Sequence, residues 1–113
     1  MITIYHNTRC SKSRCALELI QKKKKDIRVI EYMKTPPTEK ELKDVLKKLG
    51  MKAEEIIRKK KELFQKKYLT KKFSDADWIK ILIKNPILIE RPIVVIGNKA
   101  IIARPPEKVN ELF

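Results

Sequence analysis

Two cysteines in the segment YHNTRCSKSRCALELI, residues 5–20, are the residues best suited to chemistry in this sequence. Cys10 is surrounded by Arg9, Lys12 and Arg14, and we expect it in a loop between a first strand and a first helix. Unpaired N–H groups at a helix N-terminus and nearby positive charges favour the thiolate, which is the nucleophilic form of cysteine. The sequence therefore predicts an activated Cys10; the alternative is an inert loop cysteine that lies near basic residues.

The second cysteine, Cys15, is farther from Cys10 along the chain than the second cysteine of a C-x-x-C redox motif would be. Five residues along a helix rotate by about 500° and rise by about 7.5 Å. This separation exceeds what a disulfide tolerates without backbone movement. We therefore predict that Cys15 is a small core residue on the same row as Leu19, and that it resolves a Cys10 intermediate only if the first helical turn unwinds.

A histidine and two arginines are further candidates for this site. His6 precedes Cys10 at the predicted strand end, where it either hydrogen-bonds the thiolate region or caps the strand. Only six of the 28 basic residues are arginine, and bidentate recognition of an oxyanion is one reason to keep arginine in a lysine-rich chain. Arg91 and Arg104 each precede a proline at the ends of a predicted hairpin. Either these two arginines lie close enough to reach the Cys10 loop, or they are ordinary surface residues.

Hydrophobic periodicity predicts the elements that position these residues. Residues 2–5 and 27–32 are predicted strands, joined by a helix that either Ser11 or Ser13 caps. The strand–helix–strand order makes these two strands parallel. Four residues of the second strand are expected to face inward: Ile27, Val29, Ile30 and Tyr32.

The remaining sequence predicts several helices and one hairpin. Thr38 with Glu41 fits a capping box, and Gly50 ends that helix. The segment KAEEIIRKK predicts a short helix, and residues 74–85 predict a second one with an apolar face, which Pro86 ends. Two β-branched runs joined by Gly97-Asn98 predict an antiparallel hairpin, and PPEKVNELF predicts a closing helix.

This order of elements is β-α-β, then a helical segment, then β-β-α. It predicts an α/β protein with a thioredoxin-like fold, a mixed four-stranded sheet and an inserted helical subdomain. The length of 113 residues fits one domain, 1–113. Within it we expect the core to contain residues 1–35 and 86–113, and the helical insertion to span 36–85.

Composition restricts the class of protein further. The 42% apolar residues gather in clusters, which favours a folded globule despite 37% charged residues. We see no membrane span and no signal peptide, and so expect a cytoplasmic protein with free thiols. One histidine and two cysteines argue against a zinc site, so we expect no metal.

The net charge of +14 raises the question of a polyanionic partner. The lysine runs at 22–25 and 58–61 contain no interleaved aromatic residues or Arg-Gly repeats, and such runs are usually solvated helix faces. We therefore do not expect nucleic acid as the partner, and keep a basic nucleic-acid binder as the least favoured alternative.

Five segments, in order along the whole chain, resemble the ArsC family, the glutaredoxin-linked arsenate reductases and their relatives, which include Spx. The segments are YHNTRCSKSR at 5–14, YMKTPPTEKEL at 32–42, IIRKK at 56–60, NPILIERPIVV at 85–95 and ARPPEKV at 103–109.

The resemblance implies a thioredoxin-like fold and a cysteine, matching Cys10, that attacks arsenate. It implies that glutathione, as co-substrate, and then glutaredoxin supply the reducing thiols, with no tightly bound cofactor. Three arginines of the family hold the oxyanion, and they match Arg58, Arg91 and Arg104 here. The supporting positions that match are His6, Asn7, Ser13, Arg14 and Pro92, of which Pro92 matches the cis-proline of the fold.

Two positions depart from the family pattern. Thr8 stands where proline is common, and Ser13 stands where Spx-type regulators carry the second cysteine of C-x-x-C. An arsenate reductase is the leading hypothesis. The alternatives are a redox-responsive, Spx-like regulator that binds RNA polymerase, and an ArsC-like thiol protein with another substrate.

Overall fold

The computed structural model describes residues 2–23 and 26–113. The chain divides into two compact units, one containing residues up to Thr35 together with Arg91–Phe113, and the other containing Pro36–Glu90. Lys24 and Lys25 of the first lysine run lie outside the described residues, whereas Lys22 and Lys23 are exposed at the end of a helix.

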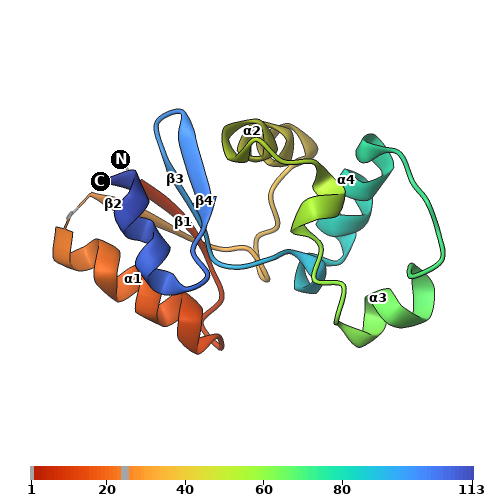
Figure 1. Ribbon diagram of the computed structural model, residues 1–113, viewed down its shortest axis with the longest axis horizontal. Coiled ribbons are helices and arrows are strands. Elements are labelled where there is room, and N and C mark those ends of the chain that lie inside the picture. The colour runs from red at the N-terminus through yellow and green to blue at the C-terminus, as the bar shows by residue number, and fades with distance from the viewer. Residues whose placement is uncertain (1, 24–25) are drawn as a thin grey trace. The chain divides into compact units, whose positions relative to one another are not determined.

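The first unit is built on a four-stranded mixed sheet, as the sequence predicts (Figure 1). Its strands are β1 (Ile2–His6), β2 (Ile27–Glu31), β3 (Ile93–Ile96) and β4 (Lys99–Ile102), in the order β2-β1-β3-β4. β2 runs parallel to β1, while β3 is antiparallel to both β1 and β4. The β3–β4 turn is the predicted Gly97-Asn98, and Gly97 has the positive φ of 57° that such a turn requires.

Helix α1 (Ser11–Lys23) and the 3-10 helix η3 (Pro106–Leu112) complete the first unit and contact each other. Their buried residues join one face of the sheet in a single hydrophobic cluster. The cluster contains Ile2, Ile4, Ala16, Ile20, Val94, Ala103 and Val109. The alternation of Ile2 and Ile4 in β1 and the helical spacing of Ala16 and Ile20 explain why these residues share one core.

Two predictions of burial in this unit are wrong. Cys15 is exposed, because the buried stripe of α1 follows Ser13, Ala16 and Ile20, and Cys15 is turned about 100° from Ala16 on the helix. Val29 is 44% exposed, because β2 lies at the edge of the sheet, where side chains are covered less completely.

The second unit contains the predicted helices and one more. α2 (Glu39–Leu49) has the capping box of Thr38 and Glu41, and it ends at Gly50 with a left-handed φ of 69°. α4 (Asp75–Lys84) is capped by Ser74, and Pro86 follows it at the start of the 3-10 helix η2 (Pro86–Leu88). The segment KAEEIIRKK forms a 3-10 helix, η1 (Ala53–Ile56), rather than an α-helix.

The additional helix is α3 (Glu62–Lys67), which the pattern of apolar residues does not predict. It buries Phe64, which stacks on Trp78 of α4, and Tyr68 and Phe73 pack edge-on against the same ring. Burial of aromatic surface therefore stabilises a helix whose lysine-rich sequence shows little periodicity. The basic run at 58–61 precedes α3, so it is a surface loop and not the expected helix face.

Segments before and after α4 are tied together inside the second unit. Ile57 and Ile89 form an antiparallel bridge, and Glu90 N–H donates to the carbonyl of Ile56 at 2.8 Å. These bonds explain why Pro86–Glu90 belongs to this unit, whereas we expected the insertion to end at residue 85. Within the described ranges, none of the helices has the length and apolar content needed to cross a membrane.

Replacing Thr38 by alanine removes the hydroxyl that accepts a hydrogen bond from Glu41 N–H in the α2 capping box. The free energy of unfolding of this unit should therefore fall by about 1 kcal/mol. Urea denaturation followed by the fluorescence of Trp78, the single tryptophan, measures it. Thr35→Ala makes the same chemical change at an exposed position before the helix. Equal losses in both variants would contradict the capping contribution.

Candidate active site

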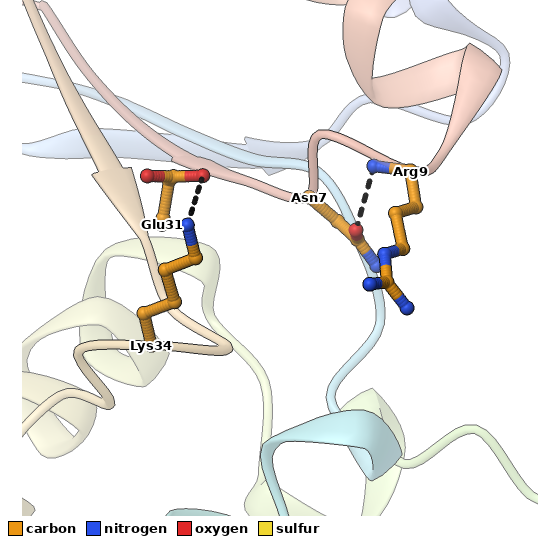
Figure 2. A network of polar contacts seen from close by, with 4 residues as sticks. All are labelled: Asn7, Arg9, Glu31 and Lys34. Atoms are coloured by element: carbon orange, nitrogen blue, oxygen red, sulfur yellow. Dashed lines mark hydrogen bonds and ion pairs between the residues drawn. The ribbon is translucent and has the colours of Figure 1, made fainter.

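The candidate site begins at the junction between β1 and α1, where Cys10 occupies the position just before the helix. Its N–H donates to the carbonyl of Asn7 at 3.0 Å, and its carbonyl accepts from Arg14 N–H at 3.0 Å. Asn7 Oδ1 accepts from Arg9 N–H at 3.0 Å, a contact that Figure 2 shows. Cys10, rather than the predicted Ser11 or Ser13, is therefore the N-terminal cap residue of α1.

The surroundings of the Cys10 sulfur lower the pKa of its thiol. Burial is the largest single influence and raises the pKa, but several groups that stabilise the thiolate outweigh it together. They are the backbone N–H groups of Ser13 and Lys12 and the charge and side-chain hydrogen bond of Arg91. An activated cysteine at the helix N-terminus stays a prediction, and these surroundings favour it.

Arg91, two residues before the start of β3, reaches the sulfur. Its Nε and Nη1 atoms are buried and have no hydrogen-bond partner in the part of the chain that the structure describes. Because buried donors without acceptors are costly, a site of this kind favours an anionic ligand that accepts from them. A guanidinium with free donors beside a thiolate is chemically suited to hold an oxyanion against a nucleophile.

Strand pairing brings Arg104 to the same end of the sheet as Arg91. Tyr5 near the end of β1 pairs with Ile93, and Ala103 N–H donates to the carbonyl of Pro92 at 2.9 Å. The residues that follow β1, precede β3 and follow β4 therefore lie at one edge. The Arg91–Pro92 peptide bond is cis, as the resemblance implies, and the Arg104–Pro105 bond, which was not predicted to be so, is also cis.

His6 and Ser13 form a buried hydrogen bond beneath the Cys10 loop. His6 Nδ1 and Ser13 Oγ are 2.6 Å apart, and Ser13 Oγ also accepts from Asn7 N–H at 3.0 Å. His6 therefore bonds Ser13, and not the sulfur itself. Burial, the largest influence, and the charge of Arg14 lower the pKa of His6, while Glu31 opposes them.

Two other predicted site residues have contacts of different kinds. Arg14 Nη1 donates to the carbonyl of Thr8 at 2.9 Å and so closes the loop around Cys10. Arg58 belongs to the second unit, where its N–H donates to the carbonyl of Leu88 at 2.7 Å. The first unit thus contains all the predicted site residues except Arg58: His6, Asn7, Cys10, Ser13, Arg14, Arg91, Pro92 and Arg104.

Sequence reasoning missed the influence of Glu31 on His6. Glu31 pairs with His6 in the parallel register of β1 and β2, so the aligned ends of the two predicted strands were the available signal. Over residues 2–23 and 26–113, no group of three histidine, cysteine or acidic side chains is arranged to hold a metal ion. Cys10 and Cys15 are both free thiols.

The chain matches the ArsC family over residues 5–112. An arsenate reductase of Neisseria meningitidis serogroup A is 40% identical over 99% of this chain and 97% of its own length. YfgD of Escherichia coli (strain K12), an uncharacterized protein, is 43% identical over 98% of this chain and 95% of its own. The solved structure of an arsenate reductase from Vibrio cholerae, 38% identical, covers 99% of this chain and 97% of that one with a TM-score of 0.93.

These likenesses extend over nearly the whole chain and include the segments that carry the Cys10 loop and both cis-prolines. The chain belongs to the ArsC family, and its mixed sheet with helices is a thioredoxin-like fold.

The Cys10 thiol should titrate below the ordinary cysteine range, and Arg91→Ala should raise its pKa because a stabilising charge and hydrogen bond are lost. The pH dependence of iodoacetamide alkylation measures it, in a Cys15→Ser background so that only Cys10 reacts. An ordinary pKa in the parent, or the same midpoint in both proteins, would contradict the proposed thiolate environment.

Stability should fall as the pH drops through the titration of His6. An unfolded histidine has its ordinary pKa of about 6.5, whereas that of folded His6 is lower, so the unfolded state binds more protons below about pH 6.5. The contribution of His6 to the free energy of unfolding should therefore be constant above about pH 7 and decline below, by at most about 1.4 kcal/mol per pH unit.

His6 is the single histidine of the chain, so urea titrations followed by circular dichroism on protein without a histidine tag isolate its contribution. His6→Gln should flatten the profile between about pH 7 and pH 5.5, a range in which carboxylates stay ionised. An unchanged slope in this variant would assign the pH dependence to another group.

Proposed function

We propose that this protein is an oxidoreductase that reduces arsenate with thiols. The observation that carries the proposal is the Cys10 sulfur, which accepts hydrogen bonds from backbone N–H groups at the start of α1 and lies beside Arg91, whose buried Nε and Nη1 have no acceptor in the described structure. The names of the relatives at about 40% identity support arsenate as the oxyanion.

In the proposed reaction the Cys10 thiolate attacks arsenic, a sulfur–arsenic bond forms, one arsenic–oxygen bond breaks, and that oxygen takes protons from solvent and leaves as water. Arg91 and Arg104, at the same sheet edge, hold the charge of the oxyanion as the bond forms. Arg58 is proposed as a third oxyanion-binding residue on the family resemblance. Positive groups that serve both the thiolate and the oxyanion lower the cost of bringing two negative species together.

Two thiols then complete the reduction. Arsenic(V) takes up two electrons from two external thiols, which form one disulfide with each other, and water then cleaves the sulfur–arsenic bond, so that arsenite leaves and the Cys10 thiol is regenerated. We propose glutathione as the first donor and glutaredoxin as the protein that receives the mixed disulfide, without a bound cofactor. A single reactive cysteine suffices for this scheme, in agreement with the outward position of Cys15. The cytoplasm, where glutathione keeps thiols reduced, is the proposed location.

The buried position of Ser13 weighs against an Spx-like regulator that binds RNA polymerase. A regulatory disulfide needs a second thiol there, whereas the Ser13 hydroxyl bonds His6 and Asn7. An ArsC-like enzyme with another substrate is the second candidate, because YfgD, at 43% identity, is uncharacterized. Other oxyanions should therefore be tested beside arsenate.

Wild-type protein should reduce arsenate in the presence of glutathione and glutaredoxin, and Cys10→Ser should fall to the uncatalysed rate because serine supplies no thiolate. Release of arsenite and oxidation of NADPH through glutathione reductase measure turnover. Cys15→Ser is the matched control and should retain most of the activity, because that thiol is exposed and outside the site. Wild-type turnover no faster than that of Cys10→Ser would exclude arsenate reduction, and equal losses in both variants would contradict the one-cysteine scheme.

A further inference from the structure

Three exposed cations are close neighbours of Cys10 in the chain, and their charges are not among the influences that shift the pKa of its thiol. Arg9 precedes the cysteine, Lys12 lies in the first turn of α1, and the Arg14 guanidinium bonds the Thr8 carbonyl of the same loop. All three side chains are exposed. We call these three residues the basic rim; they are distinct from Arg91, whose Nε and Nη1 are buried.

One acidic side chain at this end of the sheet already has a cationic partner. Glu31, which ends β2 beside His6, forms an ion pair with Lys34 at 3.9 Å. In Figure 2 the Glu31–Lys34 pair and the Arg9 side chain lie on opposite sides of Asn7. Arg9 and Lys12 make no ion pair with any of the residues that the structure describes. The Cys10 loop and the first turn of α1 therefore present positive charge to incoming molecules.

We propose that the basic rim selects an anionic thiol as the reductant that approaches Cys10. The class of ligand is a small thiol with carboxylates distant from its sulfur, and glutathione belongs to this class. The inference deepens the proposed function and rests on it, because that reaction needs an external thiol. In the proposed function the buried Arg91 binds the oxyanion. The exposed basic rim acts instead on the external thiol, which approaches Cys10 after the oxyanion has reacted.

The expected selectivity follows from the charges. Attraction between two unit charges about 6 Å apart in water makes an anionic thiol react roughly threefold faster than a neutral one. A cationic thiol is repelled by the same energy, so the energy difference between the anionic and the cationic thiol is twice as large. The effect should be large at about 0.01 M salt, where the screening length is about 30 Å, and nearly absent at 1 M, where it is about 3 Å.

Thiol–disulfide exchange at Cys10 tests the proposal without any arsenic. Cys10, in a Cys15→Ser background, is converted to its mixed disulfide with 2-thiopyridine, a neutral probe. An added thiolate attacks the Cys10 sulfur, the mixed disulfide with that thiol forms, and 2-thiopyridone leaves and is measured by its absorbance. The thiols are glutathione, neutral 2-mercaptoethanol and cationic cysteamine. Each rate is divided by that of the same thiol with a small neutral pyridyl disulfide, which removes differences in thiol pKa and nucleophilicity.

Glutathione should exceed cysteamine by about tenfold at low salt after this normalisation, and the difference should vanish at high salt. Arg9→Glu and Lys12→Glu should each reduce the ratio by about three- to tenfold. The ratio isolates the charge of the incoming thiol, because any change in Cys10 itself affects all thiols alike.

Lys99→Glu is the matched control for total charge. Lys99 is exposed in the same unit, at the hairpin turn beside Ile96, while the Cys10 loop follows the strand end that pairs near Ile93. The ratio of the normalised glutathione rate to the normalised cysteamine rate should be the same in Lys99→Glu as in the parent protein. Equal normalised rates for the three thiols would overturn the proposal, and so would a fall in the ratio for Lys99→Glu as large as that for Arg9→Glu. Charge selectivity in a protein that fails to reduce arsenate would uphold the rim and reject the arsenate step alone.

Discussion

The hydrogen bonds of Ser13 are the interactions on which the site depends. Its hydroxyl joins His6, at the end of β1, to the backbone of Asn7 in the loop, and its own N–H contributes to the thiolate environment of Cys10. The strand end, the loop and the first turn of the helix are thereby fixed to one another. Ser13 is fully buried, so water cannot substitute for these bonds without a cavity.

Charge acts in two different ways in this protein. Most of the net charge of +14 comes from exposed lysines, whose interactions water and salt weaken. Arg91 is different, because two of its nitrogens are buried and its charge acts on the sulfur directly. A chain can therefore be strongly basic without a polyanionic partner, and its chemistry can depend on one buried guanidinium.

Membership of the ArsC family and the local geometry of Cys10 are two separate supports for the proposed reaction. The family match covers residues 5–112, and the contacts of Cys10 follow from the fold of the first unit alone. The proposal of arsenate as the substrate rests on the names of relatives, whereas the proposal of thiolate chemistry rests on hydrogen bonds and burial. Alkylation and thiol–disulfide exchange measure the reactivity of the Cys10 thiol, whereas turnover measures the reduction of arsenate, so the two proposals can be tested separately.

The sequence by itself determined the elements whose signals are local. The Thr38–Glu41 capping box, Gly50, Ser74 and the Gly97-Asn98 turn depend on the backbone conformation of a few neighbouring residues, so their positions could be predicted. The Cys10 loop was found for the same reason, because a strand, a turn and a helix start adjoin it.

Only the tertiary structure decided what depends on contacts between distant residues. The exposure of Cys15 follows from which stripe of α1 meets the sheet, and α3 exists because Phe64 packs against Trp78 of a later helix. The buried Arg91 donors beside Cys10 require β3 to pair with β1 across more than 80 residues of chain. Residue types and spacing predict a nucleophile, but its partners are set by strand pairing and burial, which no local pattern contains.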